Sequence, residues 1–384
     1  MNQTNLTRMS RKGYFLFVIY GSIVLLGFYS YDLYKSAKNA EIYDFGTFYL
    51  SGYFLSVVEN PYQHSNPLSA KMQIGAYNLN PPIFLFFSEF LYQFELVPIY
   101  VCWQIFSFLC FSLSIFILLK FFAWNDINKF ILVMWSFAFA GFYQVLYNGQ
   151  MQAFLLLLYC LFLWSLVKTK KTIIPSLLLG FLVAVKPFFG LILVFLFAGG
   201  YRRIAVQSLI AFSFFCLLPL LRYDFNVYQQ WRASIGESFV YDDLSNNSLL
   251  AFFTRLHLLW LGKIMAGFIV LSAILAFYRG KFNAVKLCNI SFVIILLASP
   301  ISWTTYTLFL LPIFYLERWT IYHYIASLVF LVPVQLVFGL SNISYYHAVI
   351  FGSFHLFGIV LLFIPYIKDF ISVLKAWRRP ILDG

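Results

Sequence analysis

Residues 99–119 read IYVCWQIFSFLCFSLSIFILL, and no charged residue interrupts them. A helix needs about 20 consecutive, mainly apolar residues to cross the hydrocarbon core of a bilayer. Similar runs recur from Tyr14 to Ile367 in a chain of 384 residues that is 62% hydrophobic and only 10% charged. Because a water-soluble domain of this size could not cover itself with so little charge, the sequence predicts an all-α, polytopic bundle of transmembrane helices.

The apolar runs predict about twelve membrane spans, within a range of about 10 to 13, in a single transmembrane domain over residues 1–384. Several runs are shorter than a straight crossing requires, and the pair 172–185 and 187–200 also fits one long kinked helix. The expected spans are 14–31, 99–119, 128–147, 150–167, 172–185, 187–200, 204–221, 264–279, 285–299, 304–317, 320–339 and 347–366.

The formal net charge of +12 would suit a nucleic-acid partner, but the placement of the basic residues indicates membrane topology instead. If the N-terminus is cytoplasmic, 18 of the 26 Lys and Arg residues fall on the cytoplasmic side and 8 on the outer side. Short cytoplasmic loops carry such an excess of basic residues. We therefore expect both termini in the cytoplasm and no nucleic-acid partner.

Two long outer segments follow from this topology, residues 32–98 and 222–263. In the first, residues 47–58 and 83–97 are expected to form helices that lie at the membrane surface or re-enter it. In the second, SLLAFFTRLHLLWLGK (248–263) is expected to form another interfacial helix.

Polar phrases cluster where the spans reach the outer side. Polar groups at membrane depth are costly and usually line a cavity, although caps and turns would also place them at span ends. Asp44 lies on the same side, either as an ordinary loop charge or as a carboxylate with a chemical role. The shared side predicts one outward-facing site that comprises Asp44 and the phrases YNGQMQ (147–152), VKPF (185–188), SNNSLL (245–250) and SPISWTTY (299–306).

Lys186 is the most informative cation. Pro187 disfavours a continuous helix at this point and frees backbone groups, and a lysine between two apolar halves can hold a phosphate at the membrane surface. The alternative is a lysine that snorkels to the interface from a hairpin tip. Arg255, in the expected interfacial helix, is a second candidate for phosphate binding.

Other catalytic patterns are absent from the sequence. It contains no GxSxG, Walker A, GxGxxG or HExxH phrase. The five cysteines lie in apolar stretches and are expected to be buried packing residues. The five histidines are scattered; His347 and His355, eight residues apart, could share a helix face, but packing is the better interpretation. We expect no metal site and no cofactor.

Together these phrases resemble glycosyltransferase family 87, whose members are alpha-mannosyltransferase-like and belong to the membrane-embedded C-type glycosyltransferase superfamily. The resemblance covers most of the chain up to about residue 312. The matching phrases, in family order, are DFGTFYLSGYF (44–54), NPY (60–62), NPP (80–82), NGQMQ (148–152), VKPF (185–188), NNSLLAFFTRL (246–256) and SPISW (299–303).

The resemblance implies a C-type glycosyltransferase fold and transfer of a sugar on the non-cytoplasmic face. The donor would be a polyprenyl-phosphate-linked sugar, mannose or a related hexose or pentose, and the acceptor a hydroxyl of a glycolipid or glycan. An aspartate early in the first outer loop acts as general base in this superfamily, and Asp44 matches that position. Family members often carry acidic or histidine residues after the SPISW-like phrase, where this chain has Thr304, Thr305 and Tyr306.

The mechanism expected from this comparison is an inverting single displacement, with Lys186 and Arg255 neutralising the departing phosphate. A further set of polar and aromatic side chains is expected to bind sugar and acceptor: Tyr49, Asn148, Gln150, Gln152, Asn246, Asn247, Trp303 and Tyr306.

Two other functions remain open at the level of sequence. A transporter or flippase of lipid-linked saccharides would also suit twelve spans, although no clear internal repeat supports it, and a non-catalytic scaffold in an envelope assembly is the second alternative. The expected location is a bacterial inner (plasma) membrane, with the site facing the periplasm or exterior, where the protein contacts membrane lipids and takes part in cell-envelope glycolipid biosynthesis.

Overall fold

The computed structural model describes residues 3–38, 42–57, 59–62, 78–122, 129–169, 171–237 and 244–377. These residues form helices and connecting segments, and the described part of the chain contains no named strand. One isolated antiparallel bridge joins Asn246 and Trp303. The expectation of an all-α protein is confirmed.

Six helical segments among the described residues are long and apolar enough to cross a membrane. They are Gly13–Lys35 within α1 (Gln3–Lys38), Leu96–Lys120 within α5 (Leu96–Phe122), Lys129–Asn148 from α6 (Lys129–Phe137) and α7 (Ala140–Asn148), Arg202–Leu221 from α11 (Arg202–Leu217) and η3 (Leu218–Leu221), Leu259–Arg279 (α14), and Tyr345–Val373 from α19 (Tyr345–Phe351) and α20 (Phe354–Trp377). A seventh is counted if α17 (Ile321–Val329) and α18 (Val334–Ser341), bent by 76°, form one span.

The described residues also contain six shorter apolar helical segments of 10–17 residues. They are Pro82–Tyr92 from η1 (Pro82–Phe84) and α4 (Leu85–Tyr92), α8 (Gln152–Lys168), α9 (Ile173–Val185), Pro187–Ala198 from η2 (Pro187–Phe189) and α10 (Gly190–Ala198), α15 (Ala284–Ala298), and Thr304–Leu316 from η4 (Thr304–Leu310) and α16 (Leu311–Leu316).

The expected count of about twelve spans is therefore not confirmed. Each expected span overlaps a helix, but five of them coincide with short helices, such as 172–185 with α9 and 285–299 with α15. The 13 residues of α9 rise only about 20 Å, against a hydrocarbon core of about 30 Å. All residues of α15 from Leu287 to Leu297 are buried, so their apolar character reflects the protein interior.

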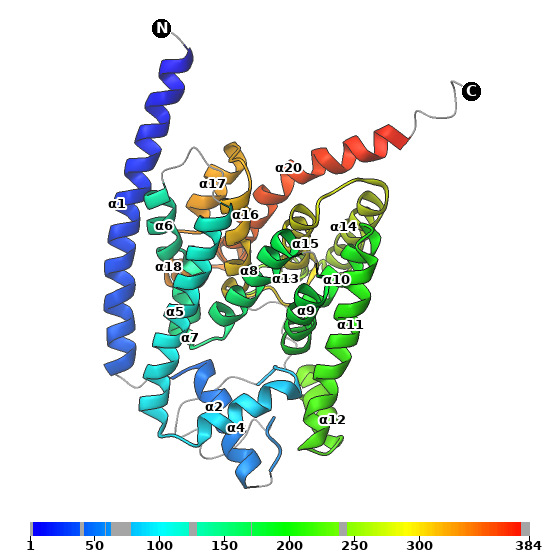
Figure 1. The fold of residues 1–384 in the computed structure, drawn as a ribbon. Helices are drawn as coiled ribbons and strands as arrows, with labels where there is room; N and C mark the ends of the chain where they lie inside the picture. The colour runs from blue at the N-terminus through cyan, green and yellow to red at the C-terminus, as the bar shows by residue number, and fades with distance from the viewer. Residues whose placement is uncertain are drawn as a thin grey trace, which may run out of the picture.

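The bundle has two distinct ends (Figure 1). In the view of Figure 1, α1 lies along one side, while α2 (Asp44–Ser56), α4 and α12 (Asn226–Glu237) lie together at the lower end. The N-terminal end of α1 and the end of α20 lie toward the opposite, upper end. The helices α2 and α4 of the first long outer segment and α12 of the second thus lie at one end of the bundle, whereas α13 (Leu249–Arg255) lies within it.

An aromatic core joins the inner helices beneath that end. The ring centroids of Phe292 and Phe309 lie 4.9 Å apart, and Phe189 lies 5.2 Å from Phe309. Tyr159 of α8 packs 5.2 Å from Phe292. Such edge-on and tilted pairs add about 0.5–1.5 kcal/mol each beyond area burial, so α8, α15 and η4 form a rigid support.

Helices form at residues 44–56 and 82–92, where two surface helices were expected, and their position at the membrane surface stays a prediction. Residues 47–58 belong largely to α2, which packs so closely on α4 that a Cβ atom at Gly52 would lie 2.1 Å from the carbonyl oxygen of Ser88. The interfacial helix expected at 248–263 is wrong. Instead α13 (Leu249–Arg255) ends and α14 begins at Leu259, because His257 has a φ of 59°, which a continuous right-handed helix excludes.

The cysteines are only partly the buried packing residues that were expected. Cys110, Cys160 and Cys288 are buried, Cys216 is half-buried and Cys102 is exposed, and all five are free thiols.

Candidate active site

The NGQ turn brings Gln150 to Asp44. Gly149 caps α7 in the left-handed region at φ 67°, and a Cβ atom there would lie 2.6 Å from the Cβ of Phe45. Trp103 fixes the turn by donating its indole N–H to the carbonyl oxygen of Gly149 at 2.8 Å. The amide of Gln150 donates a hydrogen bond to the carboxylate of Asp44. A glycine is needed here because only a residue without a side chain fits both the φ and the contact.

Asp44 is the first residue of α2, next to the buried Phe45. The N-terminal end of a helix carries partial positive charge and stabilises a carboxylate. Asp44 itself is half-buried. It is thus a carboxylate held in place by Gln150 and accessible from one side.

The break between α9 and η2 presents Lys186. Its backbone is extended, with φ −137° and ψ 97°, as expected for the residue before a proline. The side chain is 7% exposed, and its ammonium lies 5.6 Å from the centre of the Tyr306 ring. Lys186 lies outside the spanning helices, and burial lowers the pKa of its ammonium to about 8, an effect that the nearby Asp44 carboxylate partly opposes.

Asn246 and Asn247 join two loops. Asn246 donates to the carbonyl oxygen of Pro300 at 2.9 Å and accepts from the backbone N–H of Ser302 at 2.9 Å. Asn247 donates to the Thr304 hydroxyl at 2.9 Å. These bonds fix the segment that carries Trp303 and Tyr306. The structure therefore places both asparagines as supports of that segment.

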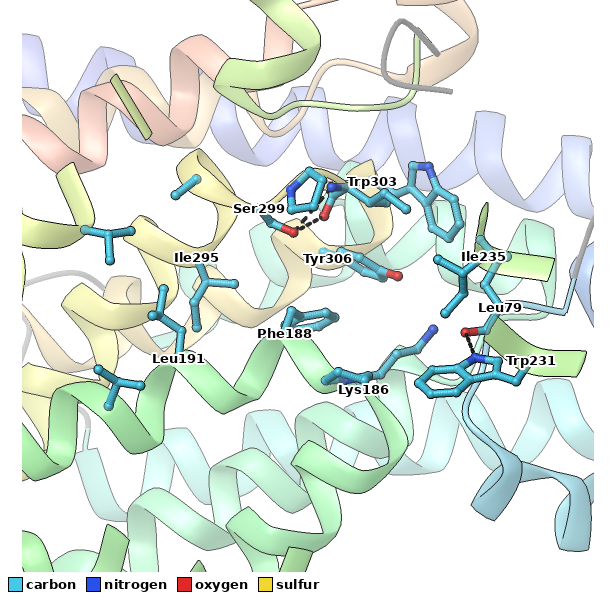
Figure 2. Close-up of a pocket in the computed structure, with 16 residues that line it drawn as sticks. Leu79, Lys186, Phe188, Leu191, Trp231, Ile235, Ile295, Ser299, Trp303 and Tyr306 are labelled. Carbon is cyan, nitrogen blue, oxygen red and sulfur yellow. Dashed lines mark hydrogen bonds between the residues drawn. The ribbon is translucent and has the colours of Figure 1, made fainter. Parts of the chain in front are cut away.

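A cavity of about 500 Å³ begins at Lys186 (Figure 2). In Figure 2 the Lys186 ammonium and the Tyr306 hydroxyl point into the same end of the cavity, while Leu191 and Ile295 lie at the other end. The lining residues are Leu79, Lys186, Pro187, Phe188, Leu191, Val194, Trp231, Ile235, Val270, Ile295, Ala298, Ser299, Pro300, Ile301, Trp303 and Tyr306. Its walls are mainly apolar, and Lys186 is the cation among them.

Two buried amide oxygens lie near this end. The side-chain oxygens of Gln150 and Gln152 have no hydrogen-bond partner among the described residues, although both side chains are at most 5% exposed. The amide of Gln152 donates to the Thr305 hydroxyl at 3.5 Å. Since buried polar atoms are normally paired, these two acceptors suit the hydroxyl groups of a polar ligand.

Of the expected site residues, Lys186, Trp303 and Tyr306 line the cavity, whereas Asp44, Gln150, Gln152, Asn246 and Asn247 do not. Three further ones are held by contacts of their own. Arg255 is buried and donates to the carbonyl oxygen of Asn246 at 3.1 Å and to the Ser353 hydroxyl at 2.9 Å. Tyr49 donates to the carbonyl oxygen of Phe94 at 2.9 Å. Asn148, at the end of α7, accepts from Gln144 at 3.0 Å. None of the three lines the cavity, and their expected roles stay predictions.

The sequence reasoning missed several lining residues. Trp231 of α12 donates its indole N–H to the carbonyl oxygen of Leu79 at 3.1 Å, and both line the cavity. Phe188 packs 4.8 Å from Tyr306. A tryptophan in the otherwise polar stretch 226–237 was a usable signal for Trp231, whereas nothing local in the sequence points to Leu79.

Among the described histidines, His323 and His355 are buried, whereas His257 is exposed. His355 is buried and bonds to the carbonyl oxygen of Val332 at 3.2 Å, and His347 contacts the Ser344 hydroxyl at 2.7 Å in a different helix, α19. No group of three or more His, Cys, Asp or Glu residues in the described ranges could hold a metal ion. His64 lies outside the described residues.

No curated protein sequence matches the chain. The family model of glycosyltransferase family 87 matches residues 78–300, a range that contains Lys186, Gln150 and Asn246 but neither Asp44 nor Trp303. The match covers more than half of the chain, and the apolar helices indicate a multi-pass membrane protein. The chain therefore belongs to glycosyltransferase family 87 and is a glycosyltransferase.

Proposed function

We propose that the protein transfers a sugar from a polyprenyl-phosphate donor to an acceptor hydroxyl at the end of the bundle that holds Asp44. The observation that carries this proposal is the cavity that runs from apolar walls to Lys186, with Asp44 close enough to Lys186 to affect its pKa. One ligand class combines an apolar chain, a phosphate and a sugar in that order. A polyprenyl-phosphate sugar is such a ligand.

The apolar walls suit the lipid part of the donor. Leu191 and Val194 come from α10, Val270 from α14 and Ile295 from α15. Val194 is 45% exposed, which supports an opening of the cavity toward the surrounding lipid. The first isoprene units would enter between these helices, because burying apolar area against apolar walls is favourable.

Lys186 suits the donor phosphate. A charge-assisted bond from an ammonium to a phosphate oxygen is stronger than a neutral hydrogen bond, and it stabilises the charge that develops on the leaving group. The Tyr306 hydroxyl points to the same end and can donate a second bond. This arrangement leaves the sugar on the side of Asp44.

Asp44 is proposed as the general base. The acceptor oxygen forms a bond to the anomeric carbon while the bond between that carbon and the phosphate oxygen breaks. The electron pair leaves with the polyprenyl phosphate, and the acceptor proton passes to the Asp44 carboxylate. One displacement inverts the anomeric configuration.

The remaining groups position the substrates. Gln150 orients Asp44 through their hydrogen bond, and the free oxygens of Gln150 and Gln152 accept from sugar hydroxyls. Trp303, held by the bridge to Asn246, offers a ring for stacking. Thr304, Thr305 and Tyr306 directly follow Trp303, with no acidic or histidine side chain among them, so Asp44 would act without a second base from that segment.

The finer assignments extend the family resemblance. We propose a mannose-type donor, a glycolipid or glycan acceptor, the C-type superfamily fold, and a location in a bacterial inner membrane with the site on the non-cytoplasmic face and both termini inside. The excess of basic residues on the opposite side supports this orientation. Membership of a transferase family argues against the transporter and scaffold alternatives.

The pH dependence of the reaction tests the role of Lys186. Because the free ammonium has a pKa of about 8, it is charged below pH 8 and loses its proton above. We expect kcat/KM, which reports the free enzyme, to fall about tenfold per pH unit above pH 8. The measurement is initial rate against pH between 6 and 9.5, at saturating acceptor and varied donor.

The matched variant is Lys186→Arg. Arginine keeps its charge throughout this range, so its profile should stay level above pH 8 even if its absolute rate is lower. A wild-type profile that is level to pH 9.5 would contradict the assignment of Lys186 to the phosphate.

A further inference from the structure

A second cavity, of about 700 Å³, lies at the far end of the bundle from Asp44. The helix α15 lines both cavities. Its residues Ile295 and Ala298 line the first cavity, and its residues Ala284 and Asn289 line the second. The 15 residues of α15 span about 22 Å. The second cavity is lined by Leu166, Val167, Tyr201, Asn283, Ala284, Val285, Lys286, Asn289, Leu316, Glu317 and Arg318.

This cavity lies at the level where the spanning helices end. The span Arg202–Leu221 begins next to Tyr201, and the span Leu259–Arg279 ends four residues before Asn283. Arg202 and Arg279 place their guanidinium groups 5.6 Å and 5.4 Å from the ring centres of Phe197 and Tyr278. Cations that fold over aromatic rings at span ends are typical of the lipid head-group region.

Two lining residues, Asn289 and Glu317, have side-chain oxygens that accept fewer hydrogen bonds from the described residues than they could. The side chain of Asn289 is 1% exposed, and its oxygen has no hydrogen-bond partner among the described residues. Its amide lies 3.5 Å from Oε1 of Glu317, which also accepts from the Tyr366 hydroxyl at 2.6 Å. No hydrogen bond of the described residues reaches Oε2 of Glu317. An acceptor pair of this kind suits a group that carries several N–H donors.

Two basic residues also line the cavity. Lys286 pairs with Asp369 at 2.7 Å, and Arg318, next in sequence to Glu317, is exposed at the cavity. Burial raises the pKa of Glu317, which lies in the link after α16, while Lys286 lowers it. A buried carboxylate is costly unless a cation accompanies it. The cavity therefore presents acceptor oxygens for a cation and basic side chains for an anion.

We propose that this cavity binds the phosphoethanolamine head group of a membrane phospholipid. The ammonium donates to Oε2 of Glu317 and to the side-chain oxygen of Asn289. The phosphate accepts from Arg318, with Lys286 beside it, and the apolar side chains of Leu166, Val167 and Leu316 contact the start of the lipid chains. This site is independent of the transfer chemistry at Asp44.

The selectivity of the site follows from its donors and acceptors. Phosphatidylcholine carries the same charges, but its trimethylammonium group has no N–H to give to Glu317 and Asn289. Phosphatidylglycerol carries the phosphate but no cation. We expect phosphatidylethanolamine to bind at least tenfold more tightly than either, because phosphatidylcholine offers no donor to the two acceptors and the hydroxyl donors of phosphatidylglycerol carry no positive charge to pair with Glu317.

Native mass spectrometry of the detergent-solubilised full chain tests this. The wild type is titrated separately with dioleoyl phosphatidylethanolamine, phosphatidylcholine and phosphatidylglycerol, and the fraction carrying one lipid is measured. Preferential one-to-one binding of phosphatidylethanolamine supports the site, whereas equal binding of the three lipids overturns it. Soluble glycerophosphoethanolamine is added as competitor: displacement of the lipid at millimolar concentration identifies the head group as the bound part, and no displacement contradicts it.

Three variants localise the binding. Glu317→Gln keeps an acceptor for Tyr366 and should abolish the preference for phosphatidylethanolamine over phosphatidylcholine. Arg318→Gln should weaken binding of all three lipids about tenfold. Lys281→Gln, an exposed lysine at the same end that does not line the cavity, should bind as the wild type does. A preference retained in Glu317→Gln would overturn the proposal, and because the readout is binding, this result is separate from any failure of the proposed transferase reaction.

Discussion

Replacing Asp44 with asparagine is expected to lower the transfer rate by about 10²–10⁴-fold. Asparagine keeps the size of the side chain and can still bond to Gln150, but it cannot take up the proton of the attacking hydroxyl. General-base catalysis typically contributes a factor of that order. The measurement is the initial rate of sugar transfer by the purified full chain, with both substrates at saturation.

The control is Glu95→Gln, which neutralises an exposed carboxylate at the start of α5. It should transfer sugar at the wild-type rate. Circular dichroism and thermal unfolding of the Asp44→Asn protein should match those of the wild type. A rate for Asp44→Asn within twofold of the wild type would remove Asp44 from the mechanism.

Replacing Lys186 with methionine is expected to lower the rate by about 10²–10³-fold, because a charged donor aimed at the leaving group is lost. The same change should stabilise the protein. Burial lowers the lysine pKa from 10.5 to about 8, which corresponds to a cost of about 3 kcal/mol for the charged form. Methionine fills similar volume without that cost.

The sign of the stability effect depends on pH. The folded-state pKa of Lys186 lies below its unfolded value, so the cost is full below pH 8 and disappears as the pH rises toward 10.5. The melting temperature of Lys186→Met should exceed that of the wild type at pH 7 and approach it at pH 10. Lys263→Met, at an exposed position outside the cavity, should change neither rate nor melting temperature. If the Lys186→Met protein transferred sugar more slowly and also melted at a lower temperature than the wild type at pH 7, Lys186 would have a structural role instead.

Local sequence chemistry predicted much of this arrangement. The proline after Lys186 was expected to interrupt a helix there, and the structure confirms that break. The glycine in NGQ was part of a polar phrase, and the structure shows it as the cap that turns Gln150 toward Asp44. Each of these features depends on residues that are adjacent in the chain.

What could not be predicted depends on packing between distant segments. Asn246 and Asn247 were expected to bind sugar, since their type suits it, but their bonds to Pro300 and Thr304 depend on how α13 meets the loop after α15. Apolar composition likewise cannot distinguish a lipid-facing span from a helix such as α15 that is buried in protein. For that reason the sequence predicted about twelve spans, whereas six or seven segments of the described residues are long and apolar enough to cross a membrane.

The most direct test of the central claim is a comparison of donors for the purified wild-type protein. Radiolabelled mannose, glucose, galactose and arabinose would be supplied either on a polyprenyl phosphate or on a nucleoside diphosphate. An extract of membrane glycolipids would serve as acceptor. The account predicts transfer from at least one polyprenyl-phosphate sugar, with release of polyprenyl phosphate, and none from any nucleotide sugar. Transfer from a nucleotide sugar without a polyprenyl carrier would contradict it.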